Sequence, residues 1–198
     1  MDRRIILAMN LLRPSTSASV LVVVDLQPKF LAAIPDAQRL LIKARFLLQV
    51  ASLLDVPALA TEQVPEKMGP TASELASLLT APPVSKRTFG CCEEPAFRSA
   101  LSSIERRQVV LIGVETHICI SQTALGLTSL GYEVAVCPDA VGARSQERHK
   151  LGMERIRDAC VAPIHTEGVV YEWLQQADHP RFREALEFVK QSSAELGE

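Results

Sequence analysis

Short, continuously apolar segments recur along this chain and alternate with longer segments in which the apolar residues have helical spacing. The clearest of them, 20–24 and 109–114, contain no charged or polar side chain. Strands buried on both faces have this composition, whereas a strand with one solvated face alternates apolar and polar residues. The pattern therefore predicts an α/β fold, a three-layer α/β/α sandwich around a parallel, doubly wound sheet of about six strands.

The order of the predicted elements indicates one domain. Strands are predicted over 20–24, 57–61, 83–86, 109–114, 132–136 and 161–164. Helices are predicted over 38–54, 71–79, 94–104, 118–130, 145–160 and from 167 to about 193. No repeat or long linker interrupts residues 19–198, which we expect to form a single domain of ordinary size. Residues 1–18 are expected to form a flexible arm, although Arg3, Arg4 and a short apolar run leave a signal or transit peptide open.

Charge and cysteine content restrict the class of protein further. The 21 basic and 23 acidic residues are interspersed and give a net charge of −2. Binders of nucleic acid or anionic membranes usually carry a basic stripe, so we expect a small-molecule substrate and neither a nucleic-acid nor a membrane partner. Five cysteines without a convincing secretion signal favour reduced thiols and a cytoplasmic location. An odd cysteine can also be a nucleophile.

Three chemically capable side chains follow predicted strands, at the sheet edge where open α/β folds bind ligands. Asp25 ends the first strand, Lys86 ends the third, and Cys119 lies five residues beyond the fourth. Taken alone, they could be a capping carboxylate, a surface lysine and a buried thiol. A thiol in the first turn of a helix is, however, expected to have a lowered pKa. Together the three can meet as base, cation and nucleophile.

The other cysteines and histidines have simpler interpretations. Cys137 and Cys160 are interpreted as packing residues, and the adjacent Cys91 and Cys92 as residues of a loop. His149 lies in a charged helical segment, so we expect it to be solvated or to cap a helix.

Several motifs surround the three candidate residues in a specific order. They are D-L-Q-x-x-F at 25–30, the isolated Lys86, and G-V-E-T-H-I-C at 113–119. With this order and spacing, roughly residues 19–190 resemble the isochorismatase-like cysteine hydrolase superfamily. The resemblance is closest to the isochorismatase domain-containing subgroup, on T-E-Q at 61–63, G-P at 69–70 and A-D-H-P-R-F at 177–182.

The resemblance implies a role for each matching residue. Asp25 would be the general base, Lys86 the lysine of the triad and Cys119 the nucleophile. A cis peptide bond between Val114 and Glu115 would direct the N–H of Glu115, together with that of Cys119, into an oxyanion hole. The implied chemistry is hydrolysis of a small amide or related C–N compound through a thioester, and we expect a homo-oligomer.

Two departures from the family's patterns narrow this chemistry. Metal-dependent nicotinamidase members carry Asp-x-His and a further His after the second strand, whereas residues 61–70 contain no histidine. We therefore expect no metal, and the lack of a Gly-rich phosphate loop argues against a nucleotide cofactor. Isochorismatases that cleave a vinyl ether lack the cysteine that Cys119 supplies. A metal-independent cysteine hydrolase is thus predicted; the alternatives are a catalytically idle scaffold or interaction protein and a nucleic-acid enzyme.

Five further residues are candidates for binding the substrate. Phe30 and Phe89 would form an apolar slot, and Gln63 would offer its amide for hydrogen bonds. His117 and Ile118, which precede Cys119, would form the wall of the pocket. Each of the five could instead be an ordinary packing or loop residue.

Overall fold

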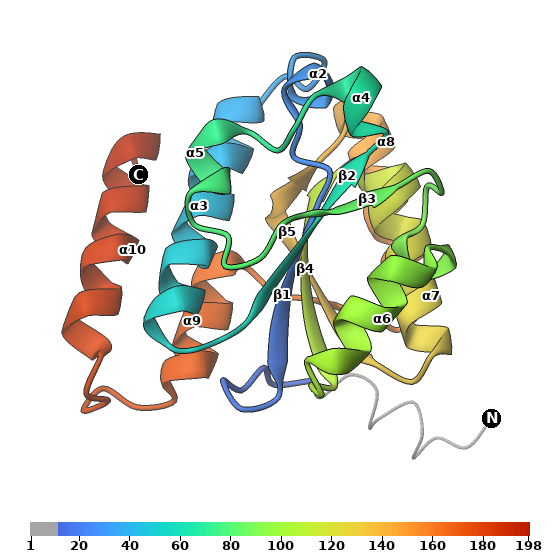
Figure 1. Cartoon of the computed structure of the whole chain (residues 1–198). Helices are drawn as coiled ribbons and strands as arrows, with labels where there is room; N and C mark the ends of the chain where they lie inside the picture. The colour runs from blue at the N-terminus through green and yellow to red at the C-terminus, as the bar shows by residue number, and fades with distance from the viewer. Residues whose placement is uncertain (1–11) are drawn as a thin grey trace.

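The computed structural model describes residues 12–198, and the sequence predictions for residues 1–11 lie outside this part. Its centre is a six-stranded, all-parallel sheet with the order β3-β2-β1-β4-β5-β6 (Figure 1). The strands are β1 (Ser19–Val24), β2 (Ala58–Gln63), β3 (Val84–Lys86), β4 (Gln108–Val114), β5 (Glu133–Gly142) and β6 (Ala162–Pro163). The predicted α/β class is thereby confirmed.

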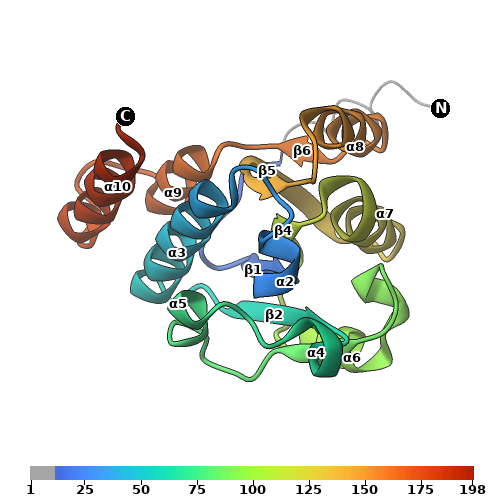
Figure 2. The ribbon, with the colours of Figure 1, turned by 90° about the horizontal axis from the view of Figure 1, so that it is seen from above.

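Helices cover both faces of this sheet and complete three layers (Figure 2). One face carries α3 (Ala37–Leu53), α5 (Ser73–Ala76) and α9 (Thr166–Leu174), with α10 (Phe182–Leu196) packed outside α3 and α9. The opposite face carries α6 (Pro95–Ser103), α7 (Ser121–Ser129) and α8 (Gln146–Asp158). Short helical segments lie in the connections: α2 (Pro28–Leu31), α4 (Pro65–Met68), η1 (Cys91–Glu93) and η2 (Thr116–Ile120).

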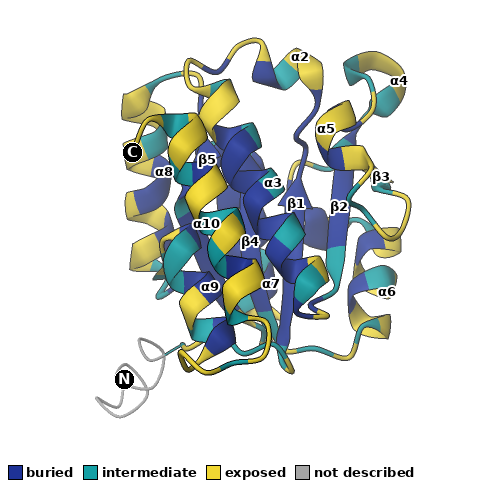
Figure 3. Ribbon diagram, turned by 90° about the vertical axis from the view of Figure 1, so that its left-hand side faces the viewer, coloured by how far each residue is buried: buried dark blue, intermediate teal, exposed yellow. Residues whose placement is uncertain are grey.

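The strands are buried on both sides, as their sequences predict. In β1, Leu21 and Val23 pack into the core under α3 and α9, whereas Val20, Val22 and Val24 pack into the core under α6, α7 and α8. Successive side chains of a strand point to opposite faces, so a strand between two helical layers needs apolar residues at every position. Figure 3 shows the result, with buried strands behind helices whose outer faces are exposed.

The predicted boundaries fail mainly in the second half of the chain. Strand β5 extends from the predicted end at Val136 to Gly142, because its last residues pair with β4 beyond a register shift. The sequence around Pro138 does not predict this second half of β5, because proline is uncommon inside strands. The final helical segment is divided into α9 and α10, and Gln175, with φ of 63°, follows the last residue of α9.

The described end of the predicted arm lies against the amino-terminal edge of the sheet. The N–H of Ser15 donates to Oε1 of Gln108 (2.9 Å), and Nε2 of Gln108 donates to the carbonyl of Arg13 (3.2 Å). Arg106 also donates to the carbonyl of Thr16. Residues 13–16 are therefore tied to the start of β4, at the opposite end of the strands from Asp25.

The order in which strands are added to the sheet reverses between β1 and β4. The chain proceeds from β1 outward to β2 and β3, then returns to β4 on the other side of β1 and continues to β5 and β6. Ligands of open α/β sheets bind beyond the carboxyl ends of the strands at such a switch point. Gly113 marks the close approach of these strands, because a Cβ atom there would lie 2.1 Å from the carbonyl oxygen of Val24.

Candidate active site

Asp25 lies directly after β1, where the chain turns away from the sheet. Its φ of 53° is in the left-handed region, which side chains other than glycine adopt mainly at constrained positions. The neighbouring strand holds it there, because Asp25 N–H donates to the carbonyl of Thr61 (3.2 Å). The hydroxyl of Thr61 also donates to Asp25 Oδ1 (2.9 Å). The carboxylate is thus fixed although it is only 1% exposed.

Lys86, at the end of β3, reaches across β2 to this carboxylate. Its Nζ lies 2.7 Å from Asp25 Oδ2, and neither side chain is more than 1% exposed. The ammonium also donates to Gln63 Oε1 (2.6 Å) and to the carbonyls of Thr88 and Phe89 (both 3.1 Å). A buried charge is tolerated only when paired and hydrogen-bonded, and one carboxylate and three neutral acceptors meet that need.

Cys119 lies in η2, a turn with π-helical hydrogen bonding between β4 and α7. The residue is 6% exposed, and its thiol lies close enough to Asp25 and Lys86 for both charges to act on it. The prediction of a lowered pKa is wrong: burial, followed by the negative charge of Asp25, raises the pKa of the thiol to about 12. Lys86 opposes this shift but does not outweigh it. The resting thiol is therefore protonated and lies near a carboxylate that can accept its proton.

The turn that carries Cys119 is held from two sides. The peptide bond between Val114 and Glu115 is cis. The Glu115 carboxylate accepts hydrogen bonds from the N–H (3.2 Å) and the Nε (3.0 Å) of Arg144, in the connection between β5 and α8. The next residue, Thr116, places its hydroxyl 3.0 Å from Nδ1 of His149. His149 is therefore half-buried against the turn, which corrects the expectation of a solvated or capping residue.

The predicted substrate-binding residues differ in their contacts and in their exposure. Gln63 already uses its amide within the protein, since Oε1 accepts from Lys86 and Nε2 donates to the carbonyl of Arg87 (3.0 Å). Phe89 leaves its ring 59% exposed, and Phe30 is half-buried against the core under α3, so the two rings do not form a closed slot.

His117 and Ile118 are both half-buried beside Cys119. Burial lowers the pKa of His117, so the imidazole is neutral near pH 7. Its Nδ1 is buried without a hydrogen-bond partner in the described part of the chain. Ile118 packs against the core under α6 and α7. Both residues remain candidates for contact with a ligand above the thiol.

The site contains residues that the sequence interpretation did not assign to it. Cys91, taken for a loop residue, is fully buried with its Sγ 3.9 Å from the Thr61 hydroxyl. Gln27 clamps β1 to β2, with Oε1 accepting from Gln63 N–H (2.8 Å) and Nε2 donating to the Gln63 carbonyl (3.2 Å). The signal for Gln27 lay in the motif at 25–30, where polar residues follow a buried strand; nothing in the sequence pattern singled out Cys91. By contrast Cys137 is fully buried in β5, as predicted for a packing residue.

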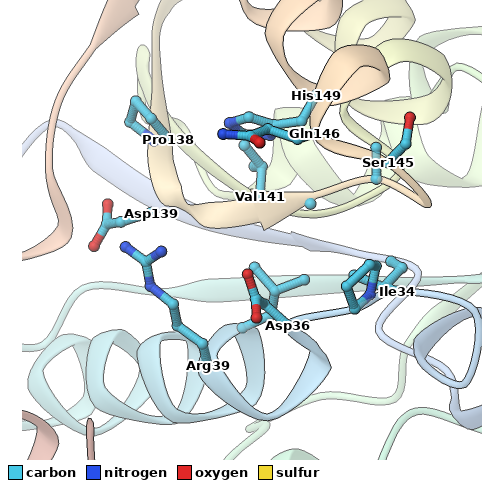
Figure 4. Close-up of a pocket in the computed structure, with 13 residues that line it drawn as sticks. Ile34, Asp36, Arg39, Pro138, Asp139, Val141, Ser145, Gln146 and His149 are labelled. Atoms are coloured by element: carbon cyan, nitrogen blue, oxygen red, sulfur yellow. The ribbon is translucent and has the colours of Figure 1, made fainter. Parts of the chain in front are cut away.

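A cavity of about 500 Å³ lies on the other side of the turn (Figure 4). It is bounded by the start of α3, the end of β5 and the start of α8, and its walls are apolar at Ile34, Leu40 and Val141. Arg39 and His149 are the basic side chains that line it. His149 thus contacts the cavity on one side and the turn that carries Cys119 on the other.

Two properties of residues 12–198 bear on cofactors and membranes. No three histidine, cysteine, aspartate or glutamate side chains in this range are grouped so that they could hold a metal ion. None of the helices described in it has the length and apolar character that crossing a bilayer requires.

Comparisons with known proteins show the family and the fold of this chain. A sequence model of the isochorismatase domain matches residues 19–168. The chain is 36% identical over 185 residues to isochorismatase domain-containing protein 2 of Danio rerio, covering 93% of each protein. It is similar to the structure of MAR1 ribonuclease from Caenorhabditis elegans, with 29% identity, a TM-score of 0.86, and coverage of 90% of this chain and 93% of that one. The fold also matches the YcaC gene product of Escherichia coli, described as an octameric hydrolase of unknown specificity, with 20% identity, a TM-score of 0.82, and coverage of 92% and 89%.

Proposed function

The chain belongs to the isochorismatase family of hydrolases, and on that premise we propose that it is a metal-independent cysteine hydrolase that cleaves a small amide or related C–N compound. The observation that supports this most is the buried ion pair between Asp25 and Lys86, 2.7 Å apart, close to the buried Cys119 thiol. A nucleophile, a base and a cation at one switch point form the arrangement that acyl transfer requires.

The reaction begins with transfer of the Cys119 proton to Asp25. The thiolate attacks the carbonyl carbon of the substrate, and the N–H groups of Glu115 and Cys119 stabilise the developing oxyanion. Asp25 then returns the proton to the leaving nitrogen, which departs as ammonia or an amine and leaves a thioester on Cys119. Water attacks this thioester with Asp25 again as base, and the carboxylic acid is released with the free thiol. Lys86 stabilises the carboxylate whenever it is ionised, and the negative charge that develops during the reaction.

The test is a panel of small primary amides and related C–N compounds, with ammonia release as the readout. We expect turnover by the wild type and none by Cys119→Ala or Asp25→Asn. Iodoacetamide should label Cys119 faster than Cys137, which is fully buried. The Cys137→Ala variant is the matched control, because it removes a thiol that has no part in the chemistry. Equal labelling of Cys119 and Cys137 in the native protein would contradict an accessible, base-assisted nucleophile.

The assembly and the compartment are part of the same proposal. The Escherichia coli protein of the same fold is described as octameric, and this supports a homo-oligomer here. The five cysteines are free, which supports a reducing, cytoplasmic location. Size-exclusion chromatography with light scattering tests the assembly, and a single species with the mass of one chain would refute it.

Two other functions remain as alternatives. A catalytically idle scaffold would show no turnover with any amide, while Asp25→Asn and Cys119→Ala would leave its partner binding intact. An RNA-cleaving activity is raised by the similar Caenorhabditis elegans structure, which is described as a ribonuclease. The net charge of −2 and the burial of Cys119 argue against it. Degradation of RNA by the wild type but not by Cys119→Ala would favour it.

A further inference from the structure

A second buried thiol lies next to the carboxylate that would serve as base. Cys91 begins η1, on the connection that follows β3, and is fully buried. Its Sγ lies 3.9 Å from Thr61 Oγ1, and Thr61 Oγ1 lies 2.9 Å from Asp25 Oδ1. We propose that Cys91 and Thr61 form a hydrogen-bond relay that positions Asp25 for the reaction at Cys119. This proposal rests on the proposed function.

The direction of the relay follows from the donors available. A hydroxyl has one hydrogen, and Thr61 donates it to Asp25 Oδ1, because a carboxylate can only accept. The lone pairs of the hydroxyl then face Cys91, whose S–H donates to them. Hydrogen bonds in such a chain polarise one another, which strengthens the bond to the carboxylate.

Cys91 is suited to act as a donor and not as a second nucleophile. Burial raises the pKa of its thiol to about 11, so the S–H proton is retained near neutral pH. Its backbone N–H donates to the hydroxyl of Thr123 (3.0 Å), and this bond fixes the start of η1 against α7. The influence of both Lys86 and Asp25 on the pKa of this thiol reflects their proximity.

The relay fixes the orientation of the Asp25 carboxylate. Oδ1 is used by Thr61, and Oδ2 faces Lys86. The backbone of Asp25 is held by the same strand residue through the carbonyl of Thr61, despite its left-handed φ of 53°. If the hydroxyl of Thr61 were lost, the carboxylate could rotate about χ1 and χ2, and the Cys119 proton would no longer face a fixed acceptor. Thr61 and Cys91 are therefore positioning residues.

The experiment measures alkylation of Cys119 by iodoacetamide between pH 5 and 9, with peptide mass spectrometry to report each cysteine separately. Thr61→Val is nearly isosteric and suits a buried strand, but it removes the hydroxyl. Thr61→Ser restores the donor. Cys91→Ala removes the outer donor, and Cys92→Ala is its matched control. Cys92 is also buried, but its Sγ faces the carbonyl of Thr123 and not the relay. Far-UV circular dichroism confirms that each variant is folded.

Each variant has a defined expectation. Thr61→Val should alkylate at least about tenfold more slowly than the wild type at the same pH, the scale of one lost hydrogen bond to a charged group. Thr61→Ser should regain most of the rate. Cys91→Ala should lose about threefold, since it acts one bond further away, and Cys92→Ala should match the wild type.

The outcomes distinguish the relay from the proposed function. If wild-type Cys119 is not alkylated in preference to Cys137, the proposed function fails and the relay fails with it. Preferential alkylation of Cys119, with rates and pH profiles of Thr61→Val and Cys91→Ala equal to those of the wild type, overturns the relay alone. Equal losses in Cys91→Ala and Cys92→Ala would also overturn it, because they would indicate a general packing effect.

Discussion

Replacement of Lys86 by methionine tests the electrostatics of the site most directly. Methionine keeps most of the length and apolar volume of lysine but removes the ammonium. The carboxylate of Asp25 would then remain 1% exposed with no cation beside it. The Thr61 hydroxyl, which donates to its Oδ1, is a neutral donor. We expect Lys86→Met to be among the most destabilising single substitutions in this chain.

The magnitude follows from the burial of both partners. Removal of one member of a buried ion pair typically costs about 3–5 kcal/mol, because the other charge is left uncompensated. Asp25→Asn should cost less, because Lys86 keeps Gln63 and the carbonyls of Thr88 and Phe89 as acceptors. The double variant should be more stable than the sum of the two single effects predicts, by about 2 kcal/mol, since it leaves no unpaired charge.

Urea unfolding of the four proteins at pH 7.5, followed by far-UV circular dichroism, gives these free energies. Lys150→Met is the control, because the 4.0 Å pair of Lys150 with Glu154 is exposed and should contribute less than about 1 kcal/mol. A loss below about 1 kcal/mol in Lys86→Met would refute the reasoning, as would strict additivity in the double variant. Either result would mean that Asp25 and Lys86 are not a charged pair in the folded protein.

Two further substitutions test the surroundings of the site. Gly113→Ala places a Cβ atom 2.1 Å from the carbonyl oxygen of Val24, so urea unfolding should show that the free energy of unfolding falls by more than about 3 kcal/mol. Gly131 has open space around it, so the control Gly131→Ala should lower the free energy of unfolding by only about 1 kcal/mol. Equal losses in the two variants would refute the steric argument. Burial lowers the pKa of His149 in the folded state, so the unfolded chain binds more protons and stability falls as the pH drops below about 6.5. The wild type should therefore lose stability faster than His149→Gln between pH 7.5 and 5.5, and parallel curves would contradict this assignment.

The sequence is informative about the fold where burial is uniform. Residues 20–24 and 109–114 are apolar at every position, and only a strand covered on both faces requires that. The sequence is less informative where pairing with a neighbouring strand determines the local structure. The second half of β5 contains Pro138 and Asp139 and gains its strand geometry from pairing with Gly113 and Val114. Strand order has the same origin, since periodicity reports which residues are buried and not which strands are neighbours.

The positions of the three candidate residues are predictable from the sequence, but their environment is not. Asp25, Lys86 and Cys119 each follow a strand, and the carboxyl ends of parallel strands share one edge of the sheet. The sign of the Cys119 pKa shift depends instead on burial and on the charge of Asp25, and sequence position near a helix start predicts the wrong sign. The sequence also does not identify Cys91 as a residue of the site, because its contact with Thr61 joins positions 30 residues apart.

The position of β2 explains why the acid and the lysine can meet at all. β2 lies between β1 and β3, so Lys86 must span two inter-strand distances of about 4.8 Å each to reach Asp25. Thr61 and Gln63 are two residues apart on β2 and point to the same face, where Thr61 holds Asp25 and Gln63 holds Lys86. Glu62, between them, binds Thr71 instead. A shift of one residue in the pairing of β2 would turn Thr61 and Gln63 away, so the strand register is itself a condition for the ion pair between Asp25 and Lys86.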